Sequence, residues 1–172
     1  MRRYSFLEAK SSYYFLFLNL FIFLGVQVSL INKFLASPYD LNIRQEDTCT
    51  KNPEKVKYLV SLGERIGVNI KKGTPKLNGM DATYEAFDGR LGQIIVTRRN
   101  LHPVAYCKLI THEFMHVLQH LNGGLKTVKP LDWKLTYSQI YTQTSLQEAE
   151  AYAYQNLVGK IYYLLNEYIE IK

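Results

Sequence analysis

Hydrophobic and polar positions divide the chain into an apolar N-terminal run and a longer stretch in which the two kinds are regularly interleaved. Between Tyr13 and Ile31 there is no charged residue, and Phe15 to Val28 is nearly all Phe, Leu, Ile and Val. At 1.5 Å per residue the charge-free run would span roughly 28 Å, about the thickness of the hydrocarbon core of a bilayer. Because the run has no polar face, we expect a membrane span rather than a buried core helix.

The flanks of this run set its expected orientation. Arg2, Arg3 and Lys10 precede it, so the positive-inside rule places the N-terminus in the cytoplasm and the rest of the chain on the non-cytoplasmic side. A cleavable signal needs small residues at −3 and −1, and sites around Leu35-Ala36-Ser37 put Leu or Phe at −3. We therefore favour an uncleaved signal anchor at residues 1–36; a cleaved signal would make the protein secreted.

After the anchor, residues 37–51 are polar and without periodicity, which indicates a linker. Residues 52–172 are enough for one domain with a core of its own. Its first expected element is a helix, which Asn52 can cap, which Pro53 suits at the first turn, and which Gly67 ends.

Two strands follow a turn-rich stretch from Lys71 to Gly79. Thr83 to Phe87 and Leu91 to Thr97 have strand character, and Asp88-Gly89 between them is a favoured hairpin pair. We expect a small antiparallel sheet, with the strand at Leu91 to Thr97 at its edge.

Two longer helices complete the expected α+β domain. The first begins at Pro103, carries apolar residues every three or four positions, and ends at Asn122-Gly123-Gly124. The second runs from Ser145 to about Tyr168, with a mild interruption at Gly159. The stretch between these helices has no clear pattern.

Charge suggests a partner that the motifs do not support. The formal net charge of +6 invites a nucleic-acid reading. The basic residues, however, occur as scattered pairs among acids, such as Arg98-Arg99, and no RNA- or DNA-binding motif is present. We expect no nucleic-acid partner, and we attribute the positive charge to a position near anionic lipid headgroups.

The helix that begins at Pro103 carries the candidate chemistry, because His112-Glu113-Phe114-Met115-His116 matches the H-E-x-x-H pattern. Residues four apart share a helix face, so His112 and His116 can aim both imidazoles at one point. Zinc accepts two histidine nitrogens and a carboxylate and leaves a fourth position for water. Glu113 can reach that water and remove its proton as it attacks a carbonyl. The alternative, a solvated helix face, fits less well because apolar residues surround the motif.

A later segment offers a third ligand and carries a family resemblance. Glu148-Ala149-Glu150-Ala151 has the E-x-x-A pattern on the predicted last helix. With H-E-x-x-H, this resembles the zincin metallopeptidases, and specifically their glutamate-zincin branch, over roughly Thr83 to Gln155. The run His116-Val117-Leu118-Gln119 is also similar to that of small zincin-like domains.

The resemblance implies a role for each matching residue. His112, His116 and Glu148 would be the ligands of Zn²⁺, and Glu113 would be the general base. The implied fold is a small zincin-like domain in which the C-terminal helix brings the third ligand to the H-E-x-x-H helix.

Glu150 is a second candidate for the third ligand, and Glu148 could instead have a local capping role. Glu150 is the rival, and the two glutamates point about 200° apart on a helix, so only one can face the metal. Ser145-x-x-Glu148 also reads as a capping box, which would occupy Glu148 locally. We favour Glu148. The family usually has Asp or Asn where this chain has Tyr152, so an expected hydrogen-bonding partner is missing.

The remaining histidine of this helix and the tyrosines near the third ligand are not expected to bind the metal. His120 lies about 12 Å along the helix from His112 and cannot complete the site, so we expect a helix-end cation or a rim residue. The other zincin pattern, with Gly at 119 and His at 122, is excluded by Gln119 and Asn122. A tyrosine between Tyr137 and Tyr154 could stabilise an oxyanion, but none is singled out.

The two cysteines leave two readings open. Cys49 and Cys107 could form one disulfide on the non-cytoplasmic side of the membrane. Alternatively, Cys107 is simply a small buried residue on its helix. Neither cysteine has a C-x-x-C partner, so a finger-type zinc site is excluded.

These expectations combine into a membrane-anchored zinc metallopeptidase that cleaves a peptide or protein substrate. The expected edge strand at Leu91 to Thr97 could pair with that substrate. One alternative is a zinc hydrolase of another amide, for example in cell-wall material. The other is a membrane-anchored binding or scaffold protein that keeps the fold without turnover; the intact Glu113 argues against it.

Overall fold

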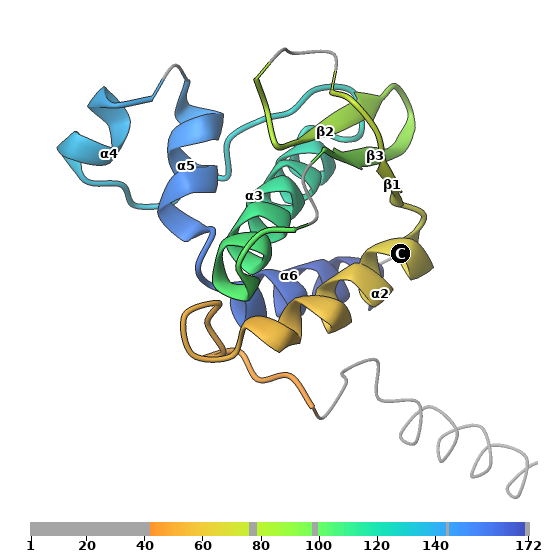
Figure 1. The fold of residues 1–172 in the computed structure, drawn as a ribbon. Helices are drawn as coiled ribbons and strands as arrows, with labels where there is room; N and C mark the ends of the chain where they lie inside the picture. Colours follow the sequence, from red (N-terminus) through yellow and green to blue (C-terminus); the bar gives the residue numbers. More distant parts are fainter. Residues whose placement is uncertain (1–41, 76–78, 98–99, 144, 171–172) are drawn as a thin grey trace, which may run out of the picture. The chain divides into compact units, whose positions relative to one another are not determined.

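The structure is a computed structural model that describes residues 42–75, 79–97, 100–143 and 145–170. These residues form an α+β fold with a small three-stranded sheet and several helices (Figure 1). No helix within the described ranges is long and apolar enough to cross a membrane. The span predicted at Phe15 to Val28 lies outside them and stays a prediction.

The sheet contains β1 (Asn69–Lys72), β2 (Ala82–Phe87) and β3 (Arg90–Val96), in the order β1-β3-β2. β2 and β3 form the predicted antiparallel hairpin. Gly89 in its turn has a φ of 72°, a left-handed conformation that glycine adopts without steric cost.

Two expectations for the sheet are wrong. β1 pairs with β3 in parallel, with Ile70 opposite Ile94, so the sheet is mixed rather than antiparallel. β3 lies between the other two strands, so Leu91 to Thr97 belongs to the central strand and not to an edge. The stretch read as turn-rich from Lys71 begins inside β1. Three of the four residues of β1 are exposed, so its strand conformation depends on pairing with β3 and leaves no local pattern.

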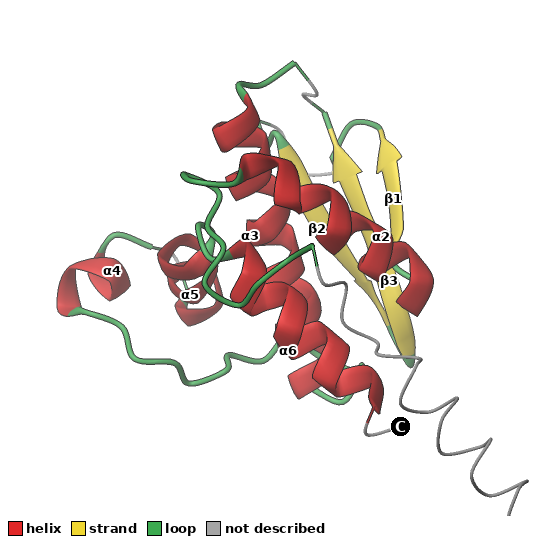
Figure 2. Cartoon of the chain, turned by 90° about the horizontal axis from the view of Figure 1, so that it is seen from below, coloured by secondary structure: helices red, strands yellow, loops and turns green. Residues whose placement is uncertain are grey.

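Helices cover one face of this sheet (Figure 2). α2 (Val56–Ile66) follows a 3₁₀ turn at Pro53–Lys55 and ends at Gly67, whose φ is 102°. The predicted helix is thus confirmed, although the side chain of Asn52 makes no capping hydrogen bond. α3 (Pro103–Asn122) also begins and ends where predicted.

The predicted C-terminal helix is two helices, α5 (Leu146–Tyr154) and α6 (Val158–Glu170). A further short helix, α4 (Tyr137–Tyr141), lies in the stretch without a clear sequence pattern. α3 packs against β2, α5 and α6, so it is the element around which the others are arranged (Figure 1).

The break between α5 and α6 receives the segment that precedes α2. The carbonyl oxygen of Asn156 accepts a hydrogen bond from the Cys49 amide at 2.8 Å. A Cβ at Gly159 would lie 1.9 Å from the carbonyl oxygen of Arg44, so only glycine permits this approach. The described part of the expected linker at 37–51 therefore packs on the domain. Its buried residues are Ile43, Asp47 and Cys49.

Cys49 and Cys107 form a disulfide, which decides between the two readings that the sequence left open. The bond ties the segment before α2 to the first half of α3. Both cysteines are fully buried, so the disulfide lies within the core.

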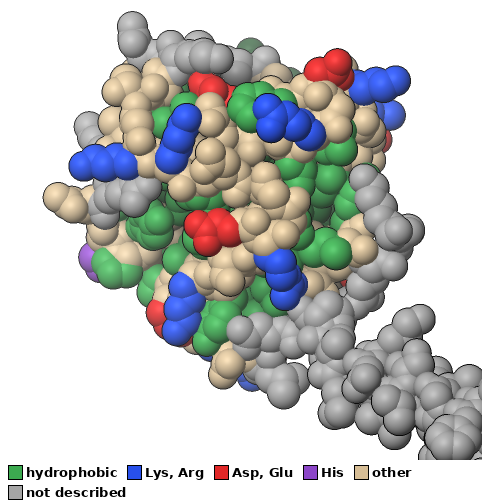
Figure 3. All heavy atoms as spheres, turned by 90° about the vertical axis from the view of Figure 1, so that its right-hand side faces the viewer, with side chains coloured by type: hydrophobic (Ala, Val, Ile, Leu, Met, Phe, Trp, Pro, Cys, Tyr) green, Lys and Arg blue, Asp and Glu red, His purple; other side chains and the backbone are tan. Residues whose placement is uncertain are grey.

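The face drawn in Figure 3 carries both basic and acidic side chains, with hydrophobic side chains between them.

Candidate metal centre

The histidine pair of the H-E-x-x-H motif lies on the side of α3 that faces β2 and α5. The Nε2 atoms of His112 and His116 are 3.2 Å apart, and the two rings meet edge to face with centroids 4.9 Å apart. Helix geometry produces this pairing, because side chains four residues apart stand one turn above another.

Glu148 reaches this pair from the first turn of α5. Its Oε2 lies 3.3 Å from Nε2 of His112, and its Oε1 lies 3.3 Å from Nε2 of His116. The hydroxyl of Ser145 accepts a hydrogen bond from the Glu148 amide at 3.2 Å and so caps α5. The capping uses only the backbone of Glu148, which leaves its carboxylate directed at the two imidazoles.

These three side chains form a cluster that could hold a metal ion. Their ligand atoms lie within 4.8 Å of one another. Ligand atoms 2.0–2.1 Å from a tetrahedral zinc would be about 3.3–3.4 Å apart. Here the two Nε2 atoms are 3.2 Å apart, and each lies 3.3 Å from a different oxygen of Glu148, so these distances involve both carboxylate oxygens. Two imidazoles and one carboxylate are also a donor set that zinc accepts with one position left for water.

Gln119, one turn beyond His116, fixes the orientation of that histidine. The Gln119 amide nitrogen donates to the carbonyl oxygen of Gln147 at 3.0 Å and to Glu150 at 2.9 Å. Its Oε1 therefore faces Nδ1 of His116, 2.8 Å away, and accepts the proton of that nitrogen. With Nδ1 protonated, His116 can offer the lone pair of Nε2 to a metal ion once Nε2 has lost its own proton.

Glu150, the rival ligand, is not brought to the histidines. It is buried on the other side of α5 and accepts hydrogen bonds from the Gln119 side chain and from the backbone amides of Leu131 and Trp133. Those bonds satisfy both of its oxygens. Glu150 thus holds the chain before α4 and supports Gln119.

Glu113 is almost completely buried beside the histidine pair. Burial raises the pKa of its carboxyl, against the charges of His112 and His116 and a hydrogen bond from the Tyr84 backbone amide, which all lower it. A carboxylate of raised pKa is a stronger proton acceptor, which suits a general base.

Glu148 and His116 shift each other's pKa. Hydrogen bonds from His112 and His116 hold the pKa of Glu148 below its ordinary range. Burial lowers the pKa of His116, but its hydrogen bond to Glu148 and the charges of Glu113 and Glu148 outweigh burial and raise it. The centre therefore favours a positive charge between its carboxylates.

A cleft of about 580 Å³ opens onto this centre. One wall is the N-terminal half of β2 with the residues before it, and the others come from α3 and α5. Within the described sheet β2 is an edge strand, since its paired neighbour is β3. The residues from the candidate centre that line the cleft are His112, Glu113, His116 and Glu148.

Tyr152 lies in the same cleft, where the resembled family has Asp or Asn. Its ring meets that of His112 edge to face, with centroids 4.6 Å apart. Tyr152 thus confines the His112 ring by packing. Among the tyrosines that the sequence left undecided, it is the one in the lining of this cleft.

His120 is not the helix-end cation or rim residue that we expected. It is completely buried, and its Nδ1 lies 2.8 Å from the hydroxyl of Tyr84. That hydroxyl also accepts the amide proton of Gly92 at 3.0 Å. The expectation fails because the chain after α3 folds back over the end of the helix, where the amide of Leu125 bonds to the carbonyl of His120.

The Tyr84 and Gln119 contacts are the parts of the site that the sequence analysis missed. The contact of Gln119 could have been predicted from the sequence, because a polar residue three positions after His116 lies on the same helix face. No sequence pattern predicts the contacts of Tyr84. Its backbone reaches Glu113 and its hydroxyl reaches His120 only because β2 packs on α3.

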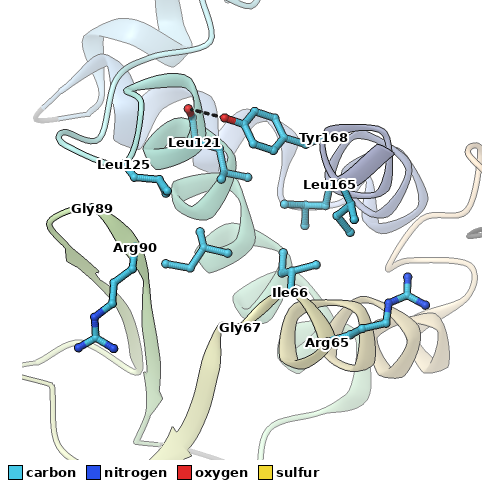
Figure 4. Close-up of a pocket in the computed structure, with 11 residues that line it drawn as sticks. Arg65, Ile66, Gly67, Gly89, Arg90, Leu121, Leu125, Leu165 and Tyr168 are labelled. Atoms are coloured by element: carbon cyan, nitrogen blue, oxygen red, sulfur yellow. Dashed lines mark hydrogen bonds between the residues drawn. The ribbon is translucent and has the colours of Figure 1, made fainter. Parts of the chain in front are cut away.

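A second cavity, of about 560 Å³, contains none of the candidate residues (Figure 4). Its walls are mainly apolar side chains from α2, α3 and α6, including Ile66, Leu121 and Leu165. Arg65 and Arg90 line it as well, but their guanidinium groups point away from its centre (Figure 4).

Comparison of the chain with protein-family models, with curated proteins and with solved structures finds no match in any of the three.

Proposed function

We propose that this chain is a membrane-anchored zinc metallopeptidase of the zincin type, in which His112, His116 and Glu148 hold Zn²⁺ and Glu113 is the general base. The observation that carries the proposal is the approach of the Glu148 carboxylate to the two imidazoles: their Nε2 atoms are 3.2 Å apart, and each lies 3.3 Å from a different oxygen of Glu148. Two residues from α3 and one from α5 thus bring together a donor set that zinc accepts.

Each protein group in the cleft has a defined task under this proposal. Zinc, when bound, lowers the pKa of a water ligand and polarises the carbonyl under attack. Gln119 keeps Nδ1 of His116 protonated, so that Nε2 is free to bind. Glu113 accepts the proton of the attacking water and can pass it to the leaving amine. The raised pKa of Glu113 favours the first of these transfers.

The substrate in this proposal is an extended peptide or protein segment. The cleft is open along β2, whose outer edge offers backbone groups in place of the strand at Leu91 to Thr97 that we had expected. A peptide that paired with this edge would gain main-chain hydrogen bonds. The Tyr84 amide shows how close β2 comes to the general base, because it donates to Glu113. The peptide bond to be cleaved would therefore lie next to the carboxyl group of Glu113.

The proposed location is the non-cytoplasmic side of a membrane, with the anchor at residues 1–36. The disulfide between Cys49 and Cys107 supports this side, because disulfides persist in oxidising compartments and are rare in the cytosol.

Metal content of the full-length chain, purified in detergent, tests the centre. We expect about one zinc per chain, and we expect His112→Ala and His116→Ala to lose it. His102→Ala is the matched control, because His102 is exposed at the start of α3 and lies outside the cleft. Stoichiometric zinc in both site variants would refute the centre.

A peptide library then tests the reaction with the same preparation. Cleavage by the wild-type chain and none by Glu113→Gln is the expected result. Zinc binding without cleavage of any peptide would favour the scaffold alternative, and cleavage of a non-peptide amide alone would favour the other hydrolase.

A further inference from the structure

Tyr84 on β2 contacts α3 at two points that lie on one side of the helix. Its backbone amide donates a hydrogen bond to Glu113, and its hydroxyl lies 2.8 Å from Nδ1 of His120. Glu113 and His120 are about two helical turns apart, so their side chains leave α3 in nearly the same direction. Tyr84 therefore lies along this side of α3, with its backbone at the proposed general base and its phenol group at His120.

The phenol end of this contact is fixed from two elements. The His120 imidazole is completely buried, and the carbonyl oxygen of the same residue accepts a hydrogen bond from the Leu125 amide at 2.9 Å. The Leu125 carbonyl oxygen in turn accepts one from the amide of Gly89, in the hairpin turn, at 2.8 Å. The Tyr84 hydroxyl also accepts the amide proton of Gly92 on β3 at 3.0 Å. Movement of the phenol group would therefore leave buried polar atoms without a partner.

The imidazole of His120 is an unfavourable group at this place in the core. Its Nε2 is buried and has no hydrogen-bond partner among the residues that the structure describes. A buried nitrogen without a partner destabilises a fold, whereas an apolar side chain of similar size would not. What the imidazole does provide is the contact of its Nδ1 with the Tyr84 hydroxyl. Holding Tyr84 therefore explains a histidine here better than filling the core does.

We infer that Tyr84, held by His120, is a positioning residue for Glu113 in the proposed reaction. Within the described residues, the Tyr84 amide is the hydrogen-bond donor to the buried Glu113 carboxyl group. A general base must lie within hydrogen-bond reach of the water that it deprotonates. A displacement of about 1 Å can lower the rate by roughly 10²-fold. The inference rests on the proposed function, because it gives Tyr84 and His120 a part in the reaction of the same centre.

Tyr84→Phe in the full-length chain tests the inference, because it removes the hydroxyl and keeps the ring and the backbone amide. His120→Leu removes the same contact from the other side. The matched control is Tyr168→Phe. The Tyr168 hydroxyl also donates a hydrogen bond to α3, to the carbonyl oxygen of Leu121 at 3.2 Å, but Tyr168 does not line the cleft. The measurements are kcat and KM on a peptide that the wild type cleaves, zinc affinity, and the hydrogen-exchange rate of the amide at position 84 by NMR.

We expect Tyr84→Phe and His120→Leu to lower kcat by roughly 10–10²-fold, because the carboxyl group of Glu113 is then held less closely to the attacking water. KM and zinc affinity should stay at their wild-type values, since neither substitution removes a zinc ligand. The amide at position 84 should exchange faster with solvent in both variants, because its hydrogen bond to Glu113 opens more often. Tyr168→Phe should leave kcat and this exchange rate unchanged.

Three results would overturn the inference. One is an equal loss of kcat in Tyr168→Phe, which would mean that Tyr84 acts only through the stability of the domain. Another is a rise in KM with unchanged kcat, which would mean that the contact serves substrate binding. The third is unchanged exchange at position 84 in both Tyr84→Phe and His120→Leu. If the wild type cleaved no peptide, the proposed function would fail, and faster exchange in the two variants would still support the positioning of the Glu113 carboxyl group.

Discussion

Oε1 of Gln119 accepts the Nδ1 proton of His116 at 2.8 Å, while Nε2 of the same histidine points at Glu148. The hydrogen bond holds the ring in place and leaves Nε2 as the nitrogen that faces the candidate centre. Gln119 in turn is held by Glu150 and by the carbonyl of Gln147, so its amide cannot turn over without losing both bonds.

Gln119→Leu should therefore weaken zinc binding by about 10–100-fold without removing any ligand. Competition with a chromophoric chelator measures this affinity in the full-length chain. Gln45→Leu is the control, because Gln45 is exposed and outside the cleft. Equal zinc affinity in Gln119→Leu and the wild type would contradict the orienting role.

Glu113→Gln should keep the zinc and lose the turnover. Glutamine has the size of glutamate and can still hydrogen-bond a water, but it cannot take up a proton. Loss of general-base assistance costs about 10²–10⁴-fold in rate. Paired measurements of zinc content and peptide cleavage test this, and release of the zinc by Glu113→Gln would show that Glu113 is a ligand instead.

The same substitution should change the pH dependence of stability. Burial raises the pKa of Glu113 above its ordinary value of 4.5, so the folded chain binds the proton more tightly than the unfolded chain. The stabilisation by that proton is fully present below pH 4.5 and is lost as the pH rises through the folded-state pKa. At neutral pH, chelator-treated Glu113→Gln should therefore unfold at a higher temperature than the wild type.

Thermal unfolding of both chains from acid to neutral pH tests this linkage. Their difference should be smallest at the acid end and grow with pH. If the difference in unfolding temperature did not depend on pH, ionisation of Glu113 would not destabilise the folded chain.

Glu148→Gln and Glu150→Gln should have opposite effects, although both lie on α5. Glu148→Gln should reduce zinc affinity, because it removes the charged ligand. Glu150→Gln should chiefly reduce the free energy of unfolding, by about 1–3 kcal/mol, because it replaces a buried acceptor of three hydrogen bonds. Zinc titration and denaturant unfolding separate the two. Loss of zinc in Glu150→Gln with retention in Glu148→Gln would reverse the assignment.

The disulfide should contribute about 2–4 kcal/mol to stability, since it closes a loop of 58 residues. Paired substitution of Cys49 and Cys107 by serine should lower the free energy of unfolding by that amount. Thiol labelling of denatured, unreduced wild type should find no free cysteine. Two labelled thiols in freshly isolated protein would contradict the bond.

The sequence alone determined the elements whose signals are local. The end of α2 at Gly67, the Asp88-Gly89 hairpin and the whole of α3 follow from residues within a few positions of one another. The pairing of His112 with His116 is local in the same sense, because one helical turn relates them. The α+β class follows from the same patterns.

The tertiary structure decided everything that depends on contacts between distant residues. β1 is a strand because it pairs with β3, and β3 is the central strand because β1 and β2 pair with its two edges. The expected long C-terminal helix broke where it receives the segment containing Cys49. His120 was buried by the chain that folds back over it.

The choice between Glu148 and Glu150 shows the physical reason. Both lie on one short helix, and the sequence established only that they face different ways. Packing of α5 on α3 turned Glu148 toward the histidines and gave Glu150 three buried donors. The sequence therefore determined which residue types the centre could use, and the packing of the two helices decided which of them meet.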